Sequence, residues 1–142
     1  MSERILIVDD EADFLEVMAE RMSNRGIEVT TAASAQEALR QVESGSFDAV
    51  ILDLKMPEVD GLETLKAIRA RQPEAQVILL SGQATLQDGI AAMKLGALDF
   101  LEKPADMNVL MEKIRKAQAR KMLVVERRAE EKVKKIVSTR GW

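Results

Sequence analysis

Four groups of charged and polar residues each follow directly after a short apolar run. Asp9-Asp10-Glu11 follows the run at positions 5–8, Asp53 follows the run at 49–52, and Ser81-Gly82 and Lys103-Pro104 follow two later ones. Three carboxylates brought close together repel one another, and a bound cation or protonation must relieve that repulsion. These residue types therefore indicate a site for a cation and for an anionic group that the lysine and serine would meet.

The chain contains no histidine and no cysteine. Thiol nucleophiles, Ser-His-Asp triads, haem ligation and nearly every zinc or copper site are thereby excluded, so a metal ion must be held by oxygen. Magnesium fits best, because it keeps several waters and meets phosphates through one or two carboxylates. A phosphoryl group is then the natural partner. Asp53 would act as its nucleophile, the metal and Lys103 would neutralise its oxygens, and the Ser81 hydroxyl would donate a hydrogen bond.

The elements that must position these residues alternate along the chain. Short aliphatic runs alternate with segments of helical period, which is typical of βα units and a parallel sheet. The predicted strands are Arg4 to Val8, Ile27 to Thr31, Asp48 to Asp53, Gln76 to Ser81 and Leu98 to Leu101. Because ligands bind at the carboxyl ends of strands in such sheets, the four polar groups should meet at one edge.

Apolar stripes at helical spacing predict the core faces of the intervening helices. These stripes are Phe14, Val17, Met18, Met22; Ala35, Ala38, Leu39, Val42; Leu62, Leu65, Ile68; and Leu86, Ile90, Met93. Glycines at 26, 45 and 96 stand where left-handed C-caps are expected, Pro73 follows the third helix, and Ser34 with Glu37 forms a capping-box pattern. A fifth helix is predicted from an N-cap at Asp106 into the basic end of the chain.

The order of these motifs resembles the response-regulator receiver family. The resemblance rests on Ile-Leu-Ile-Val-Asp-Asp-Glu at 5–11, Asp53-Leu-Lys-Met-Pro57 followed by Asp60-Gly61, then Ser81-Gly82 and Lys103-Pro104. Within this family it resembles single-domain chemotaxis receivers. It implies an α/β, flavodoxin-like, doubly wound sheet of five parallel strands in the order 2-1-3-4-5, here with an extended C-terminal helix.

The resemblance also implies a role for each site residue. Asp53 would be the phosphoacceptor, and Asp10, Asp53, the main-chain carbonyl of Lys55 and, through water, Asp9 would hold Mg²⁺. Ser81 would be the switch hydroxyl, Phe100 the switch aromatic without the hydroxyl of a tyrosine, and Lys103 the phosphate partner. The Lys103-Pro104 peptide should be cis, and Lys55 and Gln83 flank the site at positions that affect phosphoryl lifetime.

The implied function is that of a phosphorylation-controlled binding module rather than an enzyme. A histidine kinase or phosphotransfer protein, or a small acyl phosphate, would supply the phosphoryl group. Phosphorylation would then change the surface of the fourth helix, fifth strand and fifth helix for a downstream partner. Two alternatives are the receiver portion of a longer transcriptional regulator and a phosphorylation-independent interaction module. An aspartate-nucleophile phosphohydrolase fits poorly, because such enzymes need a second Asp where Lys55 stands.

The charges divide the 142-residue chain into two parts. Residues 1–105 carry 10 basic and 19 acidic side chains, whereas residues 106–142 carry 11 and 5. We expect a receiver domain over 1–120 and a basic amphipathic helical tail or linker over 121–142. A stripe of Met122, Val125, Ala129, Val133 and Ile136 suits a coiled coil or a solvated extension. A homodimer through this helix, or through the predicted switch surface, remains open.

Other partner classes are disfavoured. The apolar runs are far too short to span a bilayer, and the N-terminus lacks the features of a secretion signal, so a cytoplasmic protein is expected. Nucleic-acid binding is disfavoured because no aromatic residues interleave with the basic residues of the tail.

Overall fold

The structure is a computed structural model that describes residues 3–56, 59–82 and 85–139. Pro57 and Gln83, named above, lie outside these residues. The described chain alternates strands and helices in the following order: β1 (Arg4–Val8), α1 (Ala12–Ser23), β2 (Glu28–Ala32), α2 (Ala35–Ser44), β3 (Ala49–Leu52), α3 (Gly61–Arg71), β4 (Gln76–Ser81), α4 (Leu86–Lys94), β5 (Asp99–Glu102) and α5 (Met107–Thr139).

The strands form one parallel sheet in the order β2-β1-β3-β4-β5, which confirms the predicted flavodoxin-like arrangement. β1 pairs with both β2 and β3, and β3 in turn pairs with β4. β2 is added on one side of β1, and β3 and the later strands are added on its other side, so β1 and β3 are adjacent. Their carboxyl ends form the switch point at which open α/β sheets bind ligands.

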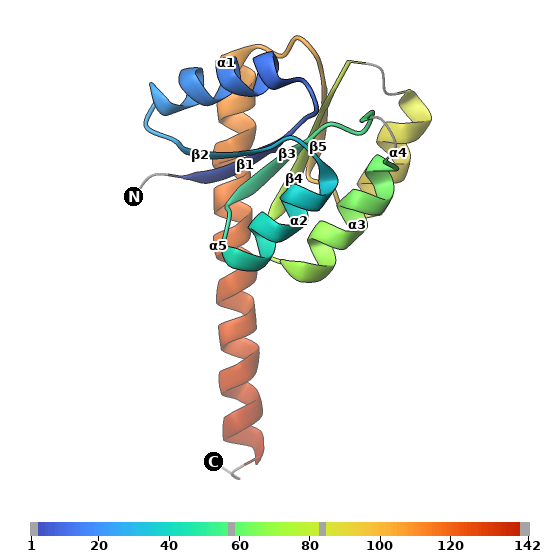
Figure 1. The fold of residues 1–142 in the computed structure, drawn as a ribbon. Coiled ribbons are helices and arrows are strands. Elements are labelled where there is room, and N and C mark those ends of the chain that lie inside the picture. The colour runs from blue at the N-terminus through green and yellow to red at the C-terminus, as the bar shows by residue number, and fades with distance from the viewer. Residues whose placement is uncertain (1–2, 57–58, 83–84, 140–142) are drawn as a thin grey trace.

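Helices cover both faces of the sheet (Figure 1). Alternate residues of β1 serve the two cores, because successive side chains of a strand point to opposite faces. Ile5 and Ile7 pack with α1 and α5, while Leu6 and Val8 pack with α2, α3 and α4. The central strands β3 and β4 are buried along their whole length, as expected for parallel strands covered on both faces.

Three of the five predicted strands differ from the structure at their ends. β2 begins one residue late because the backbone N–H of Ile27 donates to the carbonyl of Met22 and completes the end of α1. The predicted third strand is trimmed to Ala49–Leu52, and β5 begins and ends one residue later than predicted. The predicted bounds of β1 and β4 are confirmed.

Two helix faces differ from the predicted stripes. In α1, Leu15 is buried with Met18 and Met22, whereas Val17 is 44% exposed. In α4, the stripe of Leu86, Ile90 and Met93 is exposed, and the small residues Gly89 and Ala92 face the sheet. α4 packs close to β5 at this point, because a Cβ on Gly89 would already be in van der Waals contact with the ring of Phe100, at 3.5 Å.

The predicted helix caps are largely confirmed. Gly26 and Gly96 adopt positive φ values of 85° and 99°, as left-handed caps do. The Ser34 hydroxyl accepts a hydrogen bond from the Glu37 N–H, and the Asp106 carboxylate accepts one from the Asn108 N–H. The Glu37 carboxylate accepts from Ala33 rather than from Ser34.

The prediction for Gly45 is wrong, because its backbone is extended (φ −150°). The buried side chain of Gln72 explains this conformation. Its amide nitrogen donates to the carbonyls of Gly45 (2.7 Å) and Val42 (2.9 Å), and its amide oxygen accepts from the Phe47 N–H. These bonds hold the connection between α2 and β3 open, so no left-handed cap forms.

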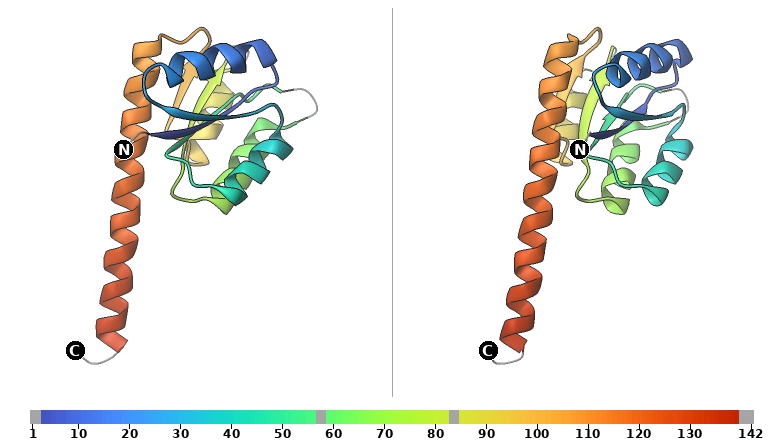
Figure 2. Two further views of the ribbon diagram at one scale, coloured as in Figure 1. Left: turned by 60° about the vertical axis from the view of Figure 1, so that its left-hand side comes forward. Right: turned by 90° about the vertical axis from the view of Figure 1, so that its left-hand side faces the viewer.

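α5 is a single helix of 33 residues. Its first part packs on the sheet through Leu110, Ile114 and Ala117, and its last part projects beyond the rest of the molecule (Figure 2). The helix continues through residue 120 without a break, so the predicted division at that residue stays a prediction. Within the described residues, no helix is long and apolar enough to cross a membrane.

Candidate functional site

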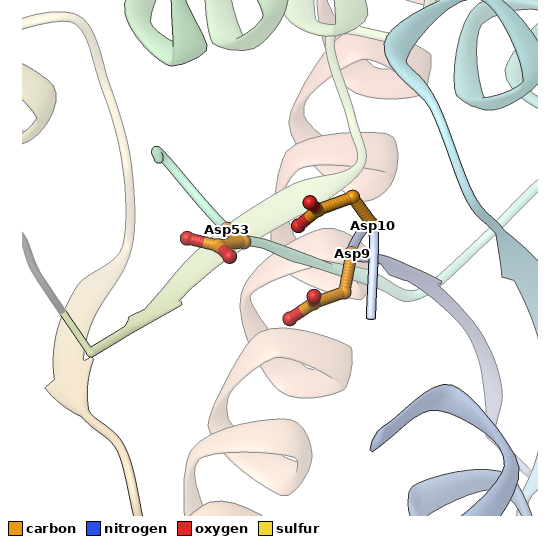
Figure 3. Close-up of side chains that lie close together, drawn as sticks. All are labelled: Asp9, Asp10 and Asp53. Atoms are coloured by element: carbon orange, nitrogen blue, oxygen red, sulfur yellow. The ribbon is translucent and has the colours of Figure 1, made fainter. Parts of the chain in front are cut away.

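Three carboxylates meet at the carboxyl ends of β1 and β3 (Figure 3). Asp9, Asp10 and Asp53 each offer an oxygen, and these oxygens all lie within 4.8 Å of one another. Asp9 and Asp53 are buried, whereas Asp10 is exposed. The sheet order therefore brings together residues 44 positions apart, as the sequence predicts.

The backbone fixes the two buried carboxylates. The N–H of Asp9 donates to the carbonyl of Ala32 on β2, and the N–H of Asp53 donates to the carbonyl of Val8 on β1. Each carboxylate also caps its own turn: Asp9 Oδ1 accepts from the Glu11 N–H at 2.9 Å and Asp53 Oδ1 from the Lys55 N–H at 3.0 Å. Short turns of this kind are typical of aspartate after a strand.

Lys103 brings the single ammonium group of the cluster. Its Nζ lies 2.6 Å from Asp9 Oδ2, 3.5 Å from Asp53 Oδ2 and 3.6 Å from Glu11 Oε1. It also lies 4.2 Å from the centre of the Phe14 ring, a cation–π contact. The peptide between Lys103 and Pro104 is cis, as the resemblance implies.

Burial and the neighbouring groups act in opposite directions on the pKa values of Asp9 and Lys103. Burial raises the pKa of Asp9 above its ordinary value, although the hydrogen bond from Lys103 and the one from the Glu11 N–H act in the other direction. Burial disfavours the charge on Lys103 too, but the hydrogen bond to Asp9 and the nearby carboxylates outweigh it and raise the lysine pKa. The lysine therefore stays an ammonium group, which suits it to meet a phosphoryl oxygen.

The hydroxyl of Ser81 reaches the same carboxylate from β4. Ser81 is buried at the end of that strand, and its Oγ donates to Asp53 Oδ1 at 2.8 Å. Oδ1 of Asp53 thus accepts two hydrogen bonds, from Ser81 and from Lys55, while Oδ2 faces the ammonium of Lys103. The structure thus places Ser81 beside Asp53, and its role as the switch hydroxyl stays a prediction.

The side chain of Lys55 points away from the carboxylates to α4. Its Nζ lies 3.2 Å from Asp88 Oδ2, and Asp88 forms a reciprocal capping box with Thr85. The hydrogen bond from the Thr85 N–H and the one from Lys55 both lower the pKa of Asp88. Lys55 therefore links the site loop to the first turn of α4, and its main-chain carbonyl as a metal ligand stays a prediction.

A cleft of about 610 Å³ opens over the cluster. It is lined by Asp10, Glu11, Asp53, Lys55, Met56, Ser81, Gly82 and Lys103. Asp9 does not line the cleft, but it accepts a hydrogen bond from Lys103, which does. The dimensions and the polar lining suit a hydrated ion together with a phosphoryl group.

Phe100 does not line this cleft. It lies half-buried on β5, beside Gly89 of α4, in a separate apolar groove. The exposed residues Leu86, Ile90 and Met93 form the rest of this groove with Lys94 and Asp99. Its predicted role as a switch aromatic stays a prediction, but its place between β5 and α4 matches the surface where the switch is expected.

The residues present fit a magnesium ion. All the side-chain donors of the cluster are carboxylate oxygens, which hard cations prefer, and the cleft leaves room for the waters that magnesium keeps. Receiver domains hold Mg²⁺ in an acidic pocket of this kind. Repulsion among three carboxylates, only partly offset by Lys103, favours a further cation at the site.

Three contacts of the site were not predicted: Phe14 beneath Lys103, Met56 in the cleft wall, and Asp88 paired with Lys55. Phe14 was assigned to the core face of the first helix. Phe14 lies in the first turn of α1, only four residues after Asp10. This short separation is the signal that places it near the carboxyl end of β1.

Comparison with known proteins agrees with this geometry. The response regulator receiver domain family matches residues 5–115. The transcriptional regulatory protein ZraR of Salmonella typhimurium is 36% identical over 115 residues, which cover 81% of this chain and 26% of that protein. The photosynthetic apparatus regulatory protein RegA of Rhodobacter capsulatus is 38% identical over 106 residues, which cover 73% and 56%.

Solved structures give the same result. A CheY-like response regulator receiver domain from Methanospirillum hungatei superposes with a TM-score of 0.81 at 30% identity, covering 86% of this chain and 98% of that one. The chain spans only about a quarter to a half of the two curated relatives named. The sheet order, the acidic cluster and these similarities lead to one conclusion: the chain belongs to the response regulator receiver domain family of two-component signalling systems.

Proposed function

We propose that the protein accepts a phosphoryl group on Asp53 in a magnesium-dependent reaction. The observation that carries this proposal is the convergence of Ser81, Lys103 and the Lys55 N–H on the Asp53 carboxylate, at 2.8, 3.5 and 3.0 Å. No other carboxylate among the described residues combines burial, a neighbouring acidic pair and an open cleft above it.

The transfer forms one bond and breaks one. An oxygen of Asp53 attacks the phosphorus, and the bond between phosphorus and the donor atom breaks, so that the donor leaves with the bonding electrons. Oδ2 is the better-placed nucleophile, because Oδ1 already accepts two hydrogen bonds. Lys103 is positioned to balance the charge on the phosphoryl oxygens, and Ser81 can turn its hydroxyl from Asp53 to one of them.

A bound Mg²⁺ would supply charge neutralisation and orientation of the phosphoryl group. Asp9, Asp10 and Asp53 would hold it. The chain's own residues keep the carboxylates in register through the backbone bonds of Asp9 and Asp53, and Phe14 holds the Lys103 side chain over the site.

The output of the reaction is binding to a partner protein rather than turnover of a second substrate. The apolar groove between α4 and β5 lies next to Phe100 and is connected to the site by the Lys55–Asp88 ion pair. A rearrangement around phosphorylated Asp53 would change this groove. A histidine kinase or phosphotransfer protein in the cytoplasm would be the phosphoryl donor, and a protein target would recognise the changed surface.

Intact mass after incubation with acetyl phosphate tests the proposal. We expect the mass of one phosphoryl group to be added to the wild type in the presence of magnesium and not in the presence of a chelator. Asp53→Asn should stay unmodified. Asp13→Asn is a matched control, because Asp13 is an exposed aspartate of α1 outside the cleft, and it should be modified like the wild type.

Equal modification of Asp53→Asn and wild type would overturn the assignment of Asp53. A wild type that stays unmodified by acetyl phosphate and by a panel of histidine kinases would instead support a phosphorylation-independent interaction module.

A second candidate is the same chemistry within a longer transcriptional regulator. It is favoured by the relatives, which are named as transcriptional regulatory proteins and extend well beyond the matched region. The mass of the protein in its native cells distinguishes the two, because a regulator with an output domain would be much larger than 15.8 kDa.

A further inference from the structure

The last part of α5 leaves the domain. Lys121 still bonds to Ser46 at 2.8 Å and lies 3.8 Å from Asp48, and Arg128 lies 3.3 Å from Glu74. The last part of the helix projects past the sheet and the other helices in all three views (Figures 1 and 2). A helix surrounded by water should be polar on every side unless another molecule covers part of it.

This segment is not polar on every side. Met122, Val125, Val133 and Ile136 are 65, 49, 60 and 46% exposed, and Ala129 stands among them. Their spacings of three, four, four and three residues keep them within an arc of about 80° on a helix with 100° per residue. They form one continuous strip, which we call the tail stripe, over about 20 Å of helix.

The domain does not cover the tail stripe. Lys121 and Arg128, which contact the domain, lie roughly 90° around the helix from the middle of the stripe. The stripe is therefore open to another molecule without any movement of the domain. The eleven-residue spacing from Met122 to Val133 is close to the helical period, so a partner helix that contacts this stripe would follow it with a slight right-handed supercoil.

The charges beside the stripe identify the partner and its direction. One side carries Glu126 and Glu130, and the opposite side carries Lys132 together with Arg128, which also pairs with Glu74 of the domain. In a parallel pair of identical helices, the acidic side of each helix faces the basic side of the other. In an antiparallel pair, acidic would face acidic and basic would face basic, which is unfavourable.

We propose that the tail stripe pairs in parallel and in register with the same stripe of a second copy of this chain. The apolar residues of the two stripes form the contact, and the flanking charges select the parallel direction. The pairing needs no phosphoryl transfer, so its test is independent of the Asp53 experiment.

Cysteine cross-linking tests both the partner and the direction. The chain has no cysteine, so every disulfide formed comes from an introduced residue. Ile136→Cys alone should form a disulfide-linked dimer under mild oxidation, because two residues 136 are adjacent in a parallel pair. A mixture of Met122→Cys and Ile136→Cys should give the two homodimers and little of the mixed dimer.

Leu123→Cys is the matched control. Leu123 is next to the stripe in sequence and 40% exposed, but it lies about 120° around the helix from the middle of the stripe. It should remain largely monomeric under the same oxidation. Predominant linkage of residue 122 to residue 136 would show an antiparallel pair, and equal linkage of residues 123 and 136 would show random collision; either result overturns the proposal.

Sedimentation equilibrium of the uncrosslinked protein gives a second measurement. The contact is only about four turns long, so a weak dimer is expected that forms as the concentration rises. Val133→Glu should raise the dimer dissociation constant by about ten-fold or more, because it places a charge in the contact. Leu123→Glu should leave it nearly unchanged. A wild type that stays monomeric into the millimolar range would overturn the proposal.

Discussion

At the scale of single residues, the side chains of Asp53 and Lys103 each bond to more than one partner at the site. The Asp53 carboxylate ends its own turn through the Lys55 N–H and also accepts from Ser81. Lys103 pairs with buried Asp9 while its ammonium faces Asp53. A substitution at any of these positions therefore changes both the local geometry and the charge of the site.

Gly61 shows how a backbone contact supports this geometry. A Cβ at this position would lie 2.5 Å from Leu54 Cα and 2.8 Å from its carbonyl carbon, and neither backbone atom can move freely beside Asp53. We expect Gly61→Ala to lower the free energy of unfolding by about 1–3 kcal/mol and to slow phosphorylation by acetyl phosphate. Urea denaturation and intact mass measure the two effects.

Gly45→Ala is the control for Gly61→Ala. The backbone of Gly45 is extended, and the nearest atom to an added Cβ is the end of the Arg4 side chain at 3.6 Å. It should leave stability and phosphorylation nearly unchanged. Equal losses in the two variants would show that the close approach to Leu54 is not the cause.

The ion pair between Asp99 and Lys113 predicts a pH dependence of stability. Burial opposes the charge of Asp99, but the hydrogen bonds from Lys113 (2.6 Å) and from the Phe100 N–H outweigh it and hold the pKa of Asp99 below its ordinary 3.8. A depressed carboxyl pKa contributes stability above the ordinary pKa, and this contribution is lost as pH falls through the folded value. The hydrogen bond to Asp99 raises the pKa of Lys113.

We expect Asp99→Asn to lower the stability at neutral pH and to leave a shallower loss of stability below pH 4 than the wild type shows. The free energy of unfolding measured in urea at a series of pH values tests this. An unchanged slope in the acid range would show that other carboxyl groups account for the acid sensitivity.

At the scale of elements, α4 is the helix whose packing departs from its apolar pattern. Gly89 and Ala92 face the sheet, and the larger Leu86, Ile90 and Met93 remain exposed around Phe100. Because the residues at the contact are small, α4 lies close to β5. The large apolar side chains of α4 are exposed and add little to the core. This suits the rearrangement that we propose for this helix on phosphorylation, because weakly packed elements open at low cost.

Ile90→Ala and Ile68→Ala compare this helix with α3. Ile90 is 48% exposed and Ile68 is fully buried. Ile68→Ala should lower the free energy of unfolding by about 2–5 kcal/mol, whereas Ile90→Ala should change it by about 0.5 kcal/mol or less. Midpoints of urea denaturation measure both, and a large loss for Ile90→Ala would mean that the exposed face packs in solution.

At the scale of the whole molecule, the domain and the projecting helix are joined by few contacts. Lys121 and Arg128 attach α5 to the amino-terminal edge of the sheet through Ser46, Asp48 and Glu74. The tail stripe, which begins at Met122 and continues beyond Arg128, remains exposed. The molecule therefore combines an acidic site at one edge of the sheet with a helix that projects from the domain.

Truncation separates the two parts. A chain ending at Ala129 should keep the stability of the full chain within about 0.5 kcal/mol at low protein concentration. A chain ending at Gln118 also loses the bonds of Lys121 and Arg128, and should be about 1–2 kcal/mol less stable. Thermal and urea denaturation test this, and a large loss in the longer chain would show that the projecting segment stabilises the domain.

The amino-acid sequence alone determined the order of the strands and helices, the residues of the site and several helix caps. It did so through residue types, their order and their periodicity. Apolar runs followed by Asp9-Asp10, Asp53, Ser81 and Lys103 predicted both the strands and the site, because a parallel sheet places all strand ends of one kind at one edge. The absence of histidine and cysteine restricted the metal to oxygen ligands. The caps at Gly26 and Gly96 followed from local backbone chemistry.

The tertiary structure alone decided which faces are buried and which distant groups meet. Periodicity shows which residues of α4 share a face, but only the packing of α4 against β5 shows that the face with Gly89 and Ala92 turns inward. Gly45 is extended because Gln72, 27 residues away, bonds to its carbonyl. Lys55 pairs with Asp88, and Phe14 lies under Lys103, for the same reason: such contacts depend on how elements pack in space, which no local pattern encodes.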